Sequence, residues 1–417
     1  MGMTMAEKIL ARASGKEKLR PGEFVIAAID LAMAHDGLGA VIRILDDAGI
    51  KKIWDPEKVV SLLDHSTPAP TVQAAEIHKM IENAVNDYNI KNFYGQRAGI
   101  CHQVLPEKGW VLPGQLIVGT DSHTTTYGAL GAAGTGIGFS EMAYVFATGK
   151  LWFMVPETIK FTILGNLPTR VMSKDIILYI AGNYSTTVAQ YKSVEFGGPV
   201  SDSFSLASRM AISNMSVEIG AKFGFFSPDE KVVAYLQTRT DREFDIINPD
   251  EDAEYEKEYI VDISTLEPQI AIPYAVDSVK PVSEVARVRL NQAVLGGCTN
   301  GRLEDLKIAA EILQKKKVKS HVRMLVVPAS AEVYKEAIKE GIIYTLIDSG
   351  AVILNPSCGI CYGSHMGLLA SGESCIASIN RNFKGRMGSP ESRVYLASPA
   401  TVAASAIEGM ITDPREY

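Results

Sequence analysis

The sequence contains few cysteines, no long apolar run and no excess of positive charge. Its 417 residues include five cysteines, an odd number that does not suit the disulfide framework of a small secreted protein. We therefore expect a reducing interior, with the cytoplasm as the compartment, where thiolates are free to bind metal. The first residues lack the basic and apolar regions of a signal peptide, and no uncharged apolar run approaches the roughly 20 residues of a membrane span. The sequence thus predicts neither export nor membrane insertion.

The charge balance argues against a nucleic-acid partner. The formal net charge is −7, whereas a protein that binds the phosphate backbone carries a basic surface. Hydrophobic residues make up 47% and charged residues 21% of the chain, which is typical of a globular protein rather than a disordered one. A lysine-rich run at 315–319 and an acidic run at 251–258 are interpreted as solvated surface segments.

The length predicts more than one domain. A single hydrophobic core stops growing at about 250–300 residues, so 417 residues favour two or three domains. Proline-punctuated or charge-rich stretches near 155–157 and at 250–280 are candidate boundaries. We therefore predict α/β domains at 1–156, 157–280 and 281–417, the last of which carries three cysteines of interest.

Short apolar runs alternate with glycine-rich turns and helical stretches, a pattern typical of α/β units around mostly parallel sheets. Expected strands span 58–63, 115–118, 158–164, 291–295, 322–327 and 351–354, and expected helices span 139–153, 173–180, 201–222, 303–316, 331–339 and 399–409. Most residues with candidate chemistry directly follow an expected strand. Because ligands bind at the carboxyl edge of such sheets, this placement indicates a binding site.

Three cysteines lie in glycine-rich segments, which let the backbone approach a metal group closely. Cys298 lies in the run GGCTNG, and Cys358 and Cys361 lie in SCGICYG. The C-x-x-C spacing alone also suits a zinc site or a redox dithiol, but a zinc ribbon needs a second close pair. Three thiolates suggest instead an iron–sulfur cube with one iron left open for substrate or water. Cys101 and Cys375 have apolar neighbours and are expected to be small buried residues.

Acidic residues stand beside histidines at two expected loops, and a further histidine lies in the segment GICHQ. The residues are Asp64, His65, His102, Asp121, Ser122 and His123. A carboxylate beside an imidazole is a common way to keep a proton donor charged near neutral pH. A lone histidine is more often a structural polar residue, but three in such surroundings weaken that interpretation.

A short turn from Asn380 to Arg386 carries three cations and two amides. Guanidinium groups bind carboxylates bidentately, so the turn indicates anion recognition, although an exposed basic turn explains the composition as well. Asn214 and Glu218 are spaced i, i+4 in an expected helix, where a surface pair is the default interpretation. The glycine-rich run at 131–138 lacks the preceding strand and the downstream acid of a dinucleotide loop, so we reject that reading.

Taken in order, these segments resemble the aconitase superfamily, and within it the large subunits of the two-chain 3-isopropylmalate dehydratase and homoaconitase group. The matching segments span almost the whole chain: Asp64-His65, GICHQ, GTDSHTTT, the helix with Asn214 and Glu218, GGCTNG, SCGIC and NRNFKGR. The resemblance implies three doubly wound α/β domains around a central cleft, with a [4Fe–4S] cluster held by Cys298, Cys358 and Cys361. It also implies a hydro-lyase that moves a hydroxyl group between adjacent carbons of a malate-type acid, with 3-isopropylmalate as the first candidate.

The resemblance implies roles for individual residues. His65, supported by Asp64, would protonate the leaving hydroxyl group. Other residues would line the site and orient bound water, namely His102, Asp121, Ser122, His123 and Glu218. Asn300 and Asn380 would support the cluster, and the set Asn380, Arg381 and Arg386 would bind substrate or organise the pocket. His35 and Asp36 take the place of a polar pair in the family, but the glycines after them are atypical and leave their role open.

The sequence departs from the family pattern at Gly297, where serine is usual, at Tyr127, where histidine is common, and at Ile360, where proline is common. These changes leave the three cysteine ligands in place, but the sequence does not decide whether the substrate is isopropylmalate, homocitrate, citramalate or dimethylmalate. Single-chain relatives carry a further domain with the serine base, so the end of this sequence at Tyr417 implies a separate small subunit. An iron-sensing RNA-binding protein and a scaffold with structural zinc are the alternatives from other classes.

Overall fold

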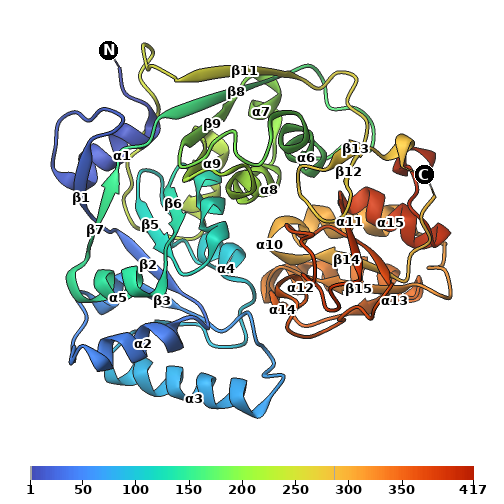
Figure 1. The fold of residues 1–417 in the computed structure, drawn as a ribbon, viewed down its shortest axis with the longest axis horizontal. Coiled ribbons are helices and arrows are strands. Elements are labelled where there is room, and N and C mark those ends of the chain that lie inside the picture. The colour runs from blue at the N-terminus through green and yellow to red at the C-terminus, as the bar shows by residue number, and fades with distance from the viewer. Residues whose placement is uncertain (1, 286) are drawn as a thin grey trace.

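Three sheets and one short ribbon organise the chain. The structure is a computed structural model that describes residues 2–285 and 287–417. Figure 1 shows the N-terminal part in blue to teal, the middle part in green to yellow and the C-terminal part in orange and red, arranged around the centre of the molecule. Within the described residues, no helix combines the length and the apolar character that crossing a membrane requires.

The N-terminal part is built on a five-stranded parallel sheet. Its strand order is β4 (Asn92–Phe93), β3 (Val59–Ser61), β2 (Leu31–Ala34), β5 (Leu116–Gly119) and β6 (Ala133–Gly136). Helices α2 (Leu38–Asp47), α3 (Val72–Asp87) and α5 (Phe139–Thr148) belong to the same part, and α2 packs against both α3 and α5. Every residue of β2, β3 and β5 is buried, as expected for parallel strands covered on both faces. An antiparallel ribbon of β1 (Phe24–Ala28) and β7 (Lys150–Met154) and helix α1 (Met5–Ser14) complete it.

The middle part contains a four-stranded parallel sheet. Its order is β10 (Phe223–Phe226), β9 (Ser193–Gly197), β8 (Thr158–Leu164) and β11 (Lys257–Asp262). Helices α6 (Ser173–Tyr184), α8 (Leu206–Met215) and α9 (Glu230–Gln237) belong to this part. A buried apolar cluster joins it to the C-terminal sheet, with Ile176 and Ile212 on one side and Ile379 and Met387 on the other.

The C-terminal part contains a seven-stranded sheet. Its order is β13 (Val279–Pro281), β12 (Gln269–Ala271), β18 (Arg393–Ala397), β17 (Ser374–Ala377), β14 (Gln292–Gly296), β15 (Arg323–Val327) and β16 (Val352–Ile353). The last five of these pair in parallel, and β12 pairs antiparallel with both neighbours. Its helices are α11 (Leu303–Leu313), α12 (Ala331–Lys339), α13 (Ile342–Asp348) and α15 (Pro399–Glu408). Pairing thus places 269–281 in the C-terminal sheet, and the three-domain division stays a prediction.

The α/β architecture predicted from the sequence is confirmed, and the strand expected at 158–164 and the helix expected at 331–339 have those bounds. The helix expected at 139–153 is wrong after Thr148, because Gly149 ends it with a left-handed φ of 68° and the next residues form β7. The helix expected at 201–222 is also wrong. It is divided into α7 (Pro199–Ser203), α8 and a 3₁₀ turn, η3 (Ser216–Ile219), which ends at Gly220 with a φ of 91°.

A second 3₁₀ segment, η2 (Ser122–Leu130), lies where the N-terminal and middle parts meet. It contacts α8, β6 and β10 closely. A methyl group on Gly128 would overlap the backbone carbonyl of Gly224 on β10. The small residue at 128 therefore lets this segment, which follows Asp121, sit directly against the next sheet.

We expect Gly128→Ala to destabilise the protein, because the added methyl group has no room. Overpacking of a filled interior costs about 1–3 kcal/mol, which should lower the apparent melting temperature. Gly197→Ala is the matched control, since a β-carbon at Gly197 would meet no atom within 4 Å. Equal melting temperatures for the two variants would contradict the close contact between η2 and β10.

Candidate active site

A cavity of about 830 Å³ lies where the three parts of the chain meet. Residues that line it follow the carboxyl ends of parallel strands in two sheets. Asp121 follows β5, Cys298 follows β14, and Asn380 follows β17. Most residues predicted for the site line this cavity, namely His65, His102, Asp121, Ser122, His123, Cys298, Cys358, Cys361, Asn380, Arg381 and Arg386. The predicted edge-of-sheet location therefore holds.

Asp64 and His65 form a buried pair beside the cavity. The Nδ1 atom of His65 lies 2.7 Å from Oδ1 of Asp64, and the backbone N–H of Cys101 donates to Oδ2 of Asp64 at 2.8 Å. On the other side of the ring, Nε2 of His65 lies 3.4 Å from Oδ2 of Asp121. Burial disfavours the charged ring, but the two carboxylates outweigh it and raise the pKa of His65 well above its usual value. The carboxylates of Asp64 and Asp121 thus favour the protonated form of the His65 ring.

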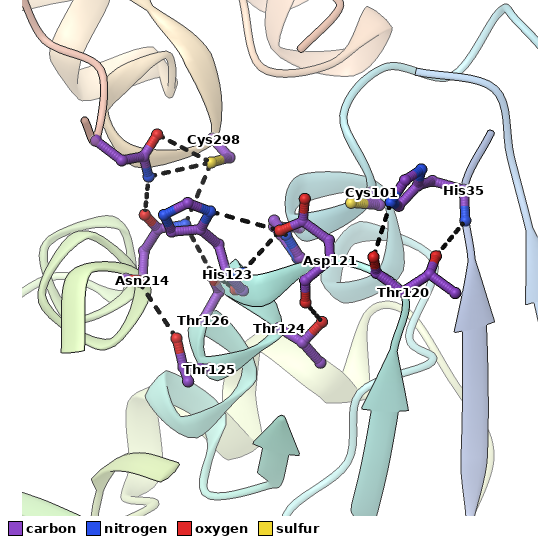
Figure 2. A network of polar contacts seen from close by, with 12 residues as sticks. His35, Cys101, Thr120, Asp121, His123, Thr124, Thr125, Thr126, Asn214 and Cys298 are labelled. Atoms are coloured by element: carbon purple, nitrogen blue, oxygen red, sulfur yellow. Dashed lines mark hydrogen bonds and ion pairs between the residues drawn. The ribbon is translucent and has the colours of Figure 1, made fainter. Parts of the chain in front are cut away.

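Asp121 is the centre of a histidine network. Its Oδ1 atom accepts a 2.7 Å hydrogen bond from Nε2 of His102 and another from the backbone N–H of His123 at 2.7 Å. Figure 2 shows Asp121 between His123 on one side and Cys101 and His35 on the other. Burial opposes ionisation, yet the interactions with His102, His123 and His65 hold the pKa of Asp121 well below its usual value. The carboxylate thus stays charged and orients three imidazoles.

Glu218 connects this network to the basic turn. Its Oε1 atom lies 2.9 Å from Nε2 of His123 and accepts from Nε of Arg381 at 2.6 Å. Glu218 is 7% exposed, and Asn214 is fully buried. The default interpretation of Asn214 and Glu218 as a helix-surface pair is therefore wrong, because α8 ends at Met215 and turns both side chains into the interior.

The three predicted ligand cysteines face the cavity from two segments of the C-terminal part. Cys298, Cys358 and Cys361 are 2%, 8% and 2% exposed, and all are free thiols. The side chain of Asn380 bridges two of them, with Nδ2 lying 3.5 Å from Sγ of Cys298 and Oδ1 accepting from Sγ of Cys361 at 3.2 Å. Asn214 also donates to Cys298 at 3.3 Å (Figure 2). Amide donors around sulfur stabilise thiolates.

This donor set fits an iron–sulfur cluster better than a single zinc ion. The thiolate sulfurs that bind one zinc ion lie about 2.3 Å from the metal and therefore close to one another. Within residues 2–285 and 287–417, the only group of possible ligands gathered within 4.8 Å of one another is His35, Asp36, Asp64 and His65, which contains no cysteine. The three sulfurs therefore do not all lie within 4.8 Å of one another, so they do not form the compact set that a single zinc ion takes.

The group of His35, Asp36, Asp64 and His65 is already satisfied by the protein. Asp36 accepts the backbone N–H groups of Asp64, His65 and Ser66 at 2.8, 2.9 and 3.0 Å. His35 stacks on His65 with ring centroids 4.1 Å apart, and its Nε2 lies 3.1 Å from the carbonyl oxygen of Thr120. His35 and Asp36, whose role the sequence left open, thus contact the ring of His65 and the backbone of the loop that carries it.

Two predicted supporting residues have different surroundings. Asn300 donates to Oδ1 of Asp305 at 3.0 Å and does not line the cavity. Arg386 lines the cavity, and its Nη2 lies 3.8 Å from Sγ of Cys361. Phe383 and Lys384, in the same turn, are exposed. The basic turn is therefore divided, with its two arginines in the cavity and its middle in solvent.

Sequence reasoning missed two charged groups at this site. Arg302 is 3% exposed and donates to the carbonyls of Thr299 and Cys298 at 2.6 and 2.8 Å, which holds the turn around the first ligand. Lys222 lines the cavity with its Nζ 5.5 Å from the centre of the Tyr191 ring. Neither lies in a recognisable motif, and both look like ordinary surface cations in the sequence.

The cavity, enclosed by parallel α/β sheets, thus combines three free thiols that could bind metal with a carboxylate–histidine network suited to acid–base chemistry. Residues 8–409 match the Aconitase family (aconitate hydratase). The chain belongs to the aconitase family, and the prediction of a hydro-lyase is confirmed.

Curated relatives cover the chain from end to end. It is 53% identical to "3-isopropylmalate dehydratase large subunit 1" of Methanopyrus kandleri over 100% of both chains. It is 47% identical to "3-isopropylmalate dehydratase large subunit" of Aquifex aeolicus, over 100% of this chain and 98% of the relative. It is 50% identical to "Probable methanogen homoaconitase large subunit" of Methanothermobacter thermautotrophicus, over 99% and 98%. These matches confirm the resemblance found in the motifs.

A solved structure shows the same fold. The chain superimposes on holo aconitase X of Thermococcus kodakaraensis with a TM-score of 0.50 and 12% identity, over 86% of this chain and 84% of that one. At this identity the likeness concerns the fold alone.

Proposed function

We propose that this chain is the cluster-bearing large subunit of a 3-isopropylmalate dehydratase, which moves a hydroxyl group between adjacent carbons by dehydration and rehydration. The observation that carries the proposal is one cavity with three free thiols, a His65 ring held between two carboxylates and two arginines. Similarity over the full length to dehydratase large subunits supports the choice of substrate.

Cys298, Cys358 and Cys361 hold the proposed [4Fe–4S] cluster. When bound, a cluster with three protein thiolates supplies an open iron that acts as a Lewis acid toward a hydroxyl or carboxylate oxygen. Asn214 and Asn380 direct amide N–H groups at Sγ of Cys298, which favours the thiolate form of this ligand. The five unpaired cysteines also support a reducing compartment, so the proposed location is the cytoplasm.

His65 is the proposed general acid, and it delivers a proton from Nε2 to the departing hydroxyl oxygen. Asp64 binds Nδ1 and so fixes the ring orientation and stabilises its charge. Asp121 lies 3.4 Å from the same Nε2 atom, close enough to hold the proton until substrate or water takes its place. General acid catalysis of this kind contributes about 10²–10⁴-fold to a rate.

Other side chains of the cavity bind and orient the substrate. Arg381 and Arg386 are the proposed carboxylate-binding residues, because guanidinium groups bind carboxylates with two parallel hydrogen bonds. Glu218 fixes the direction of Arg381 through its Nε atom, which leaves the terminal nitrogens for substrate. Ser122, His102 and His123 offer the polar wall that orients water.

The proposal includes a second polypeptide that completes the site and supplies the base. The relatives are named large subunits, and the residues proposed here include an acid but no base for abstracting a proton from carbon. We expect the chain reconstituted with iron and sulfide to show no dehydratase rate alone, and to gain a rate when the small subunit is added. Anaerobic assays against isopropylmalate, with and without that subunit, measure this, and a steady rate from the chain alone would contradict it.

Homoaconitase activity is the second candidate, because one relative at 50% identity carries that name. The same assembled pair assayed against homocitrate, citramalate and dimethylmalate separates the candidates. The specificity constant is expected to be highest for 3-isopropylmalate. Salt-sensitive RNA binding without turnover would favour the sensor alternative, and bound zinc without labile sulfide would favour the scaffold.

A further inference from the structure

Lys174, near the start of α6, is a fully buried cation that takes no part in the mechanism described above. It is 0% exposed, and its Nζ atom donates to the backbone carbonyls of Ser378 and Ile379 at 3.2 and 2.6 Å. No carboxylate in the described part of the chain forms an ion pair with it. An ammonium group buried without a counter-charge is costly, so its presence here requires a reason.

The two carbonyls lead directly to the proposed cluster. They belong to the residues just before Asn380, whose side chain contacts Cys298 and Cys361. The backbone N–H of Gly296, two residues before Cys298, donates to Oγ of Ser378 at 2.9 Å. Lys174 thus holds the segment from which Asn380 reaches both ligand segments.

The neighbouring carboxylate, Asp175, directs its hydrogen bonds to backbone groups and not to Lys174. Asp175 accepts the backbone N–H groups of Met172 and Gln269 at 2.8 and 2.9 Å, and burial raises its pKa to about 7. Burial lowers the pKa of Lys174 to about 8. The carbonyls that Lys174 binds directly precede Asn380, which contacts the sulfurs of Cys298 and Cys361, so a cluster held by these cysteines would bring negative charge close to the ammonium group.

We propose that Lys174 is the buried counter-charge of the thiolate-ligated cluster and positions Asn380 against the ligand sulfurs. The cation stabilises the negative charge that three thiolates bring to the site, and the cluster in turn compensates the buried cation. Lys174 is a positioning residue in this inference, which rests on the proposed cluster.

The test compares Lys174→Met with Lys231→Met in the full chain, reconstituted anaerobically with iron and sulfide. Lys231 is the matched control, because it also donates to two carbonyls, those of Asp202 and Phe204 at 2.6 and 3.0 Å, but on the surface and outside the cavity. Bound iron and labile sulfide are followed during exposure to a chelator, and the melting temperature is measured with and without cluster.

Lys174→Met is expected to lose its iron about 10–100-fold faster than the wild type, the range seen when a partner of a metal ligand is removed. Without cluster, this variant should melt no lower than the wild type, because it no longer buries an unbalanced charge. Lys231→Met should retain iron like the wild type.

Two results would overturn the inference: iron retention equal to the wild type, or a cluster-free Lys174→Met chain that melts lower or does not fold, which would give Lys174 a purely structural role. Failure of the wild-type and Lys231→Met chains to load iron and sulfide would instead contradict the proposed cluster itself, so the two failures are distinguishable.

Discussion

Replacing Cys298 by serine is expected to leave the chain without its full content of iron and labile sulfide, and the assembled enzyme without measurable turnover. Cys298 is the only proposed ligand outside the C-x-x-C segment, so its loss leaves two sulfurs from a single short loop. A serine hydroxyl is a much weaker ligand for iron than a thiolate. Asn214 and Asn380 would then direct their amides at an oxygen instead of a sulfur.

The matched control is Cys375→Ser, because Cys375 is also fully buried and free but lies within β17 and does not line the cavity. This control should keep its iron and its turnover, with only a cost in stability. Iron and sulfide analysis after anaerobic reconstitution gives the answer independently of activity. Unchanged metal content in Cys298→Ser would remove the basis of the proposed cluster.

Replacing Asp64 by asparagine is expected to lower kcat of the assembled enzyme by about 10²–10⁴-fold, the contribution of general acid catalysis. The carboxylate accepts from His65 and from the N–H of Cys101, and an asparagine amide cannot accept at both oxygen positions. The pKa of His65 is raised, so the ring is charged below that pKa and loses its proton as the pH rises through it. Removing Asp64 should therefore move the alkaline limb of the kcat/KM profile to lower pH.

The control for the charge change is Asp262→Asn, at the exposed end of β11. Iron content must be measured alongside, since only a variant that keeps its cluster reports on proton transfer. Because the substitution leaves the backbone of Asp64 unchanged, we expect Asp64→Asn to retain its iron. A kcat within a factor of about two of the wild type would contradict the role of His65 as the acid.

The motifs predicted the site because their spacing places chemistry at strand ends, as for Asp121 after β5 and Cys298 after β14. The sequence did not predict the burial of Glu218, since the periodicity at 201–222 suggests one continuous helix, whereas α8 ends at Met215 and Glu218 lies in the 3₁₀ turn η3. It also did not predict the role of Asp36, because backbone N–H groups from another loop have no signature in a sequence. Lys174 belongs to none of the motifs, and only the tertiary packing reveals what it contacts.

Asp64 contacts both the C-x-x-C loop, through its backbone carbonyl, and the His65 ring, through its side chain. Its carbonyl oxygen accepts from the N–H of Cys358 at 2.7 Å and from the hydroxyl of Ser357 at 2.8 Å, while its carboxylate binds His65. Damage that displaces the C-x-x-C loop therefore also misaligns the proton donor. Oxidative loss of the metal centre should therefore also disturb proton donation by His65, and repair of the metal centre should restore both functions together.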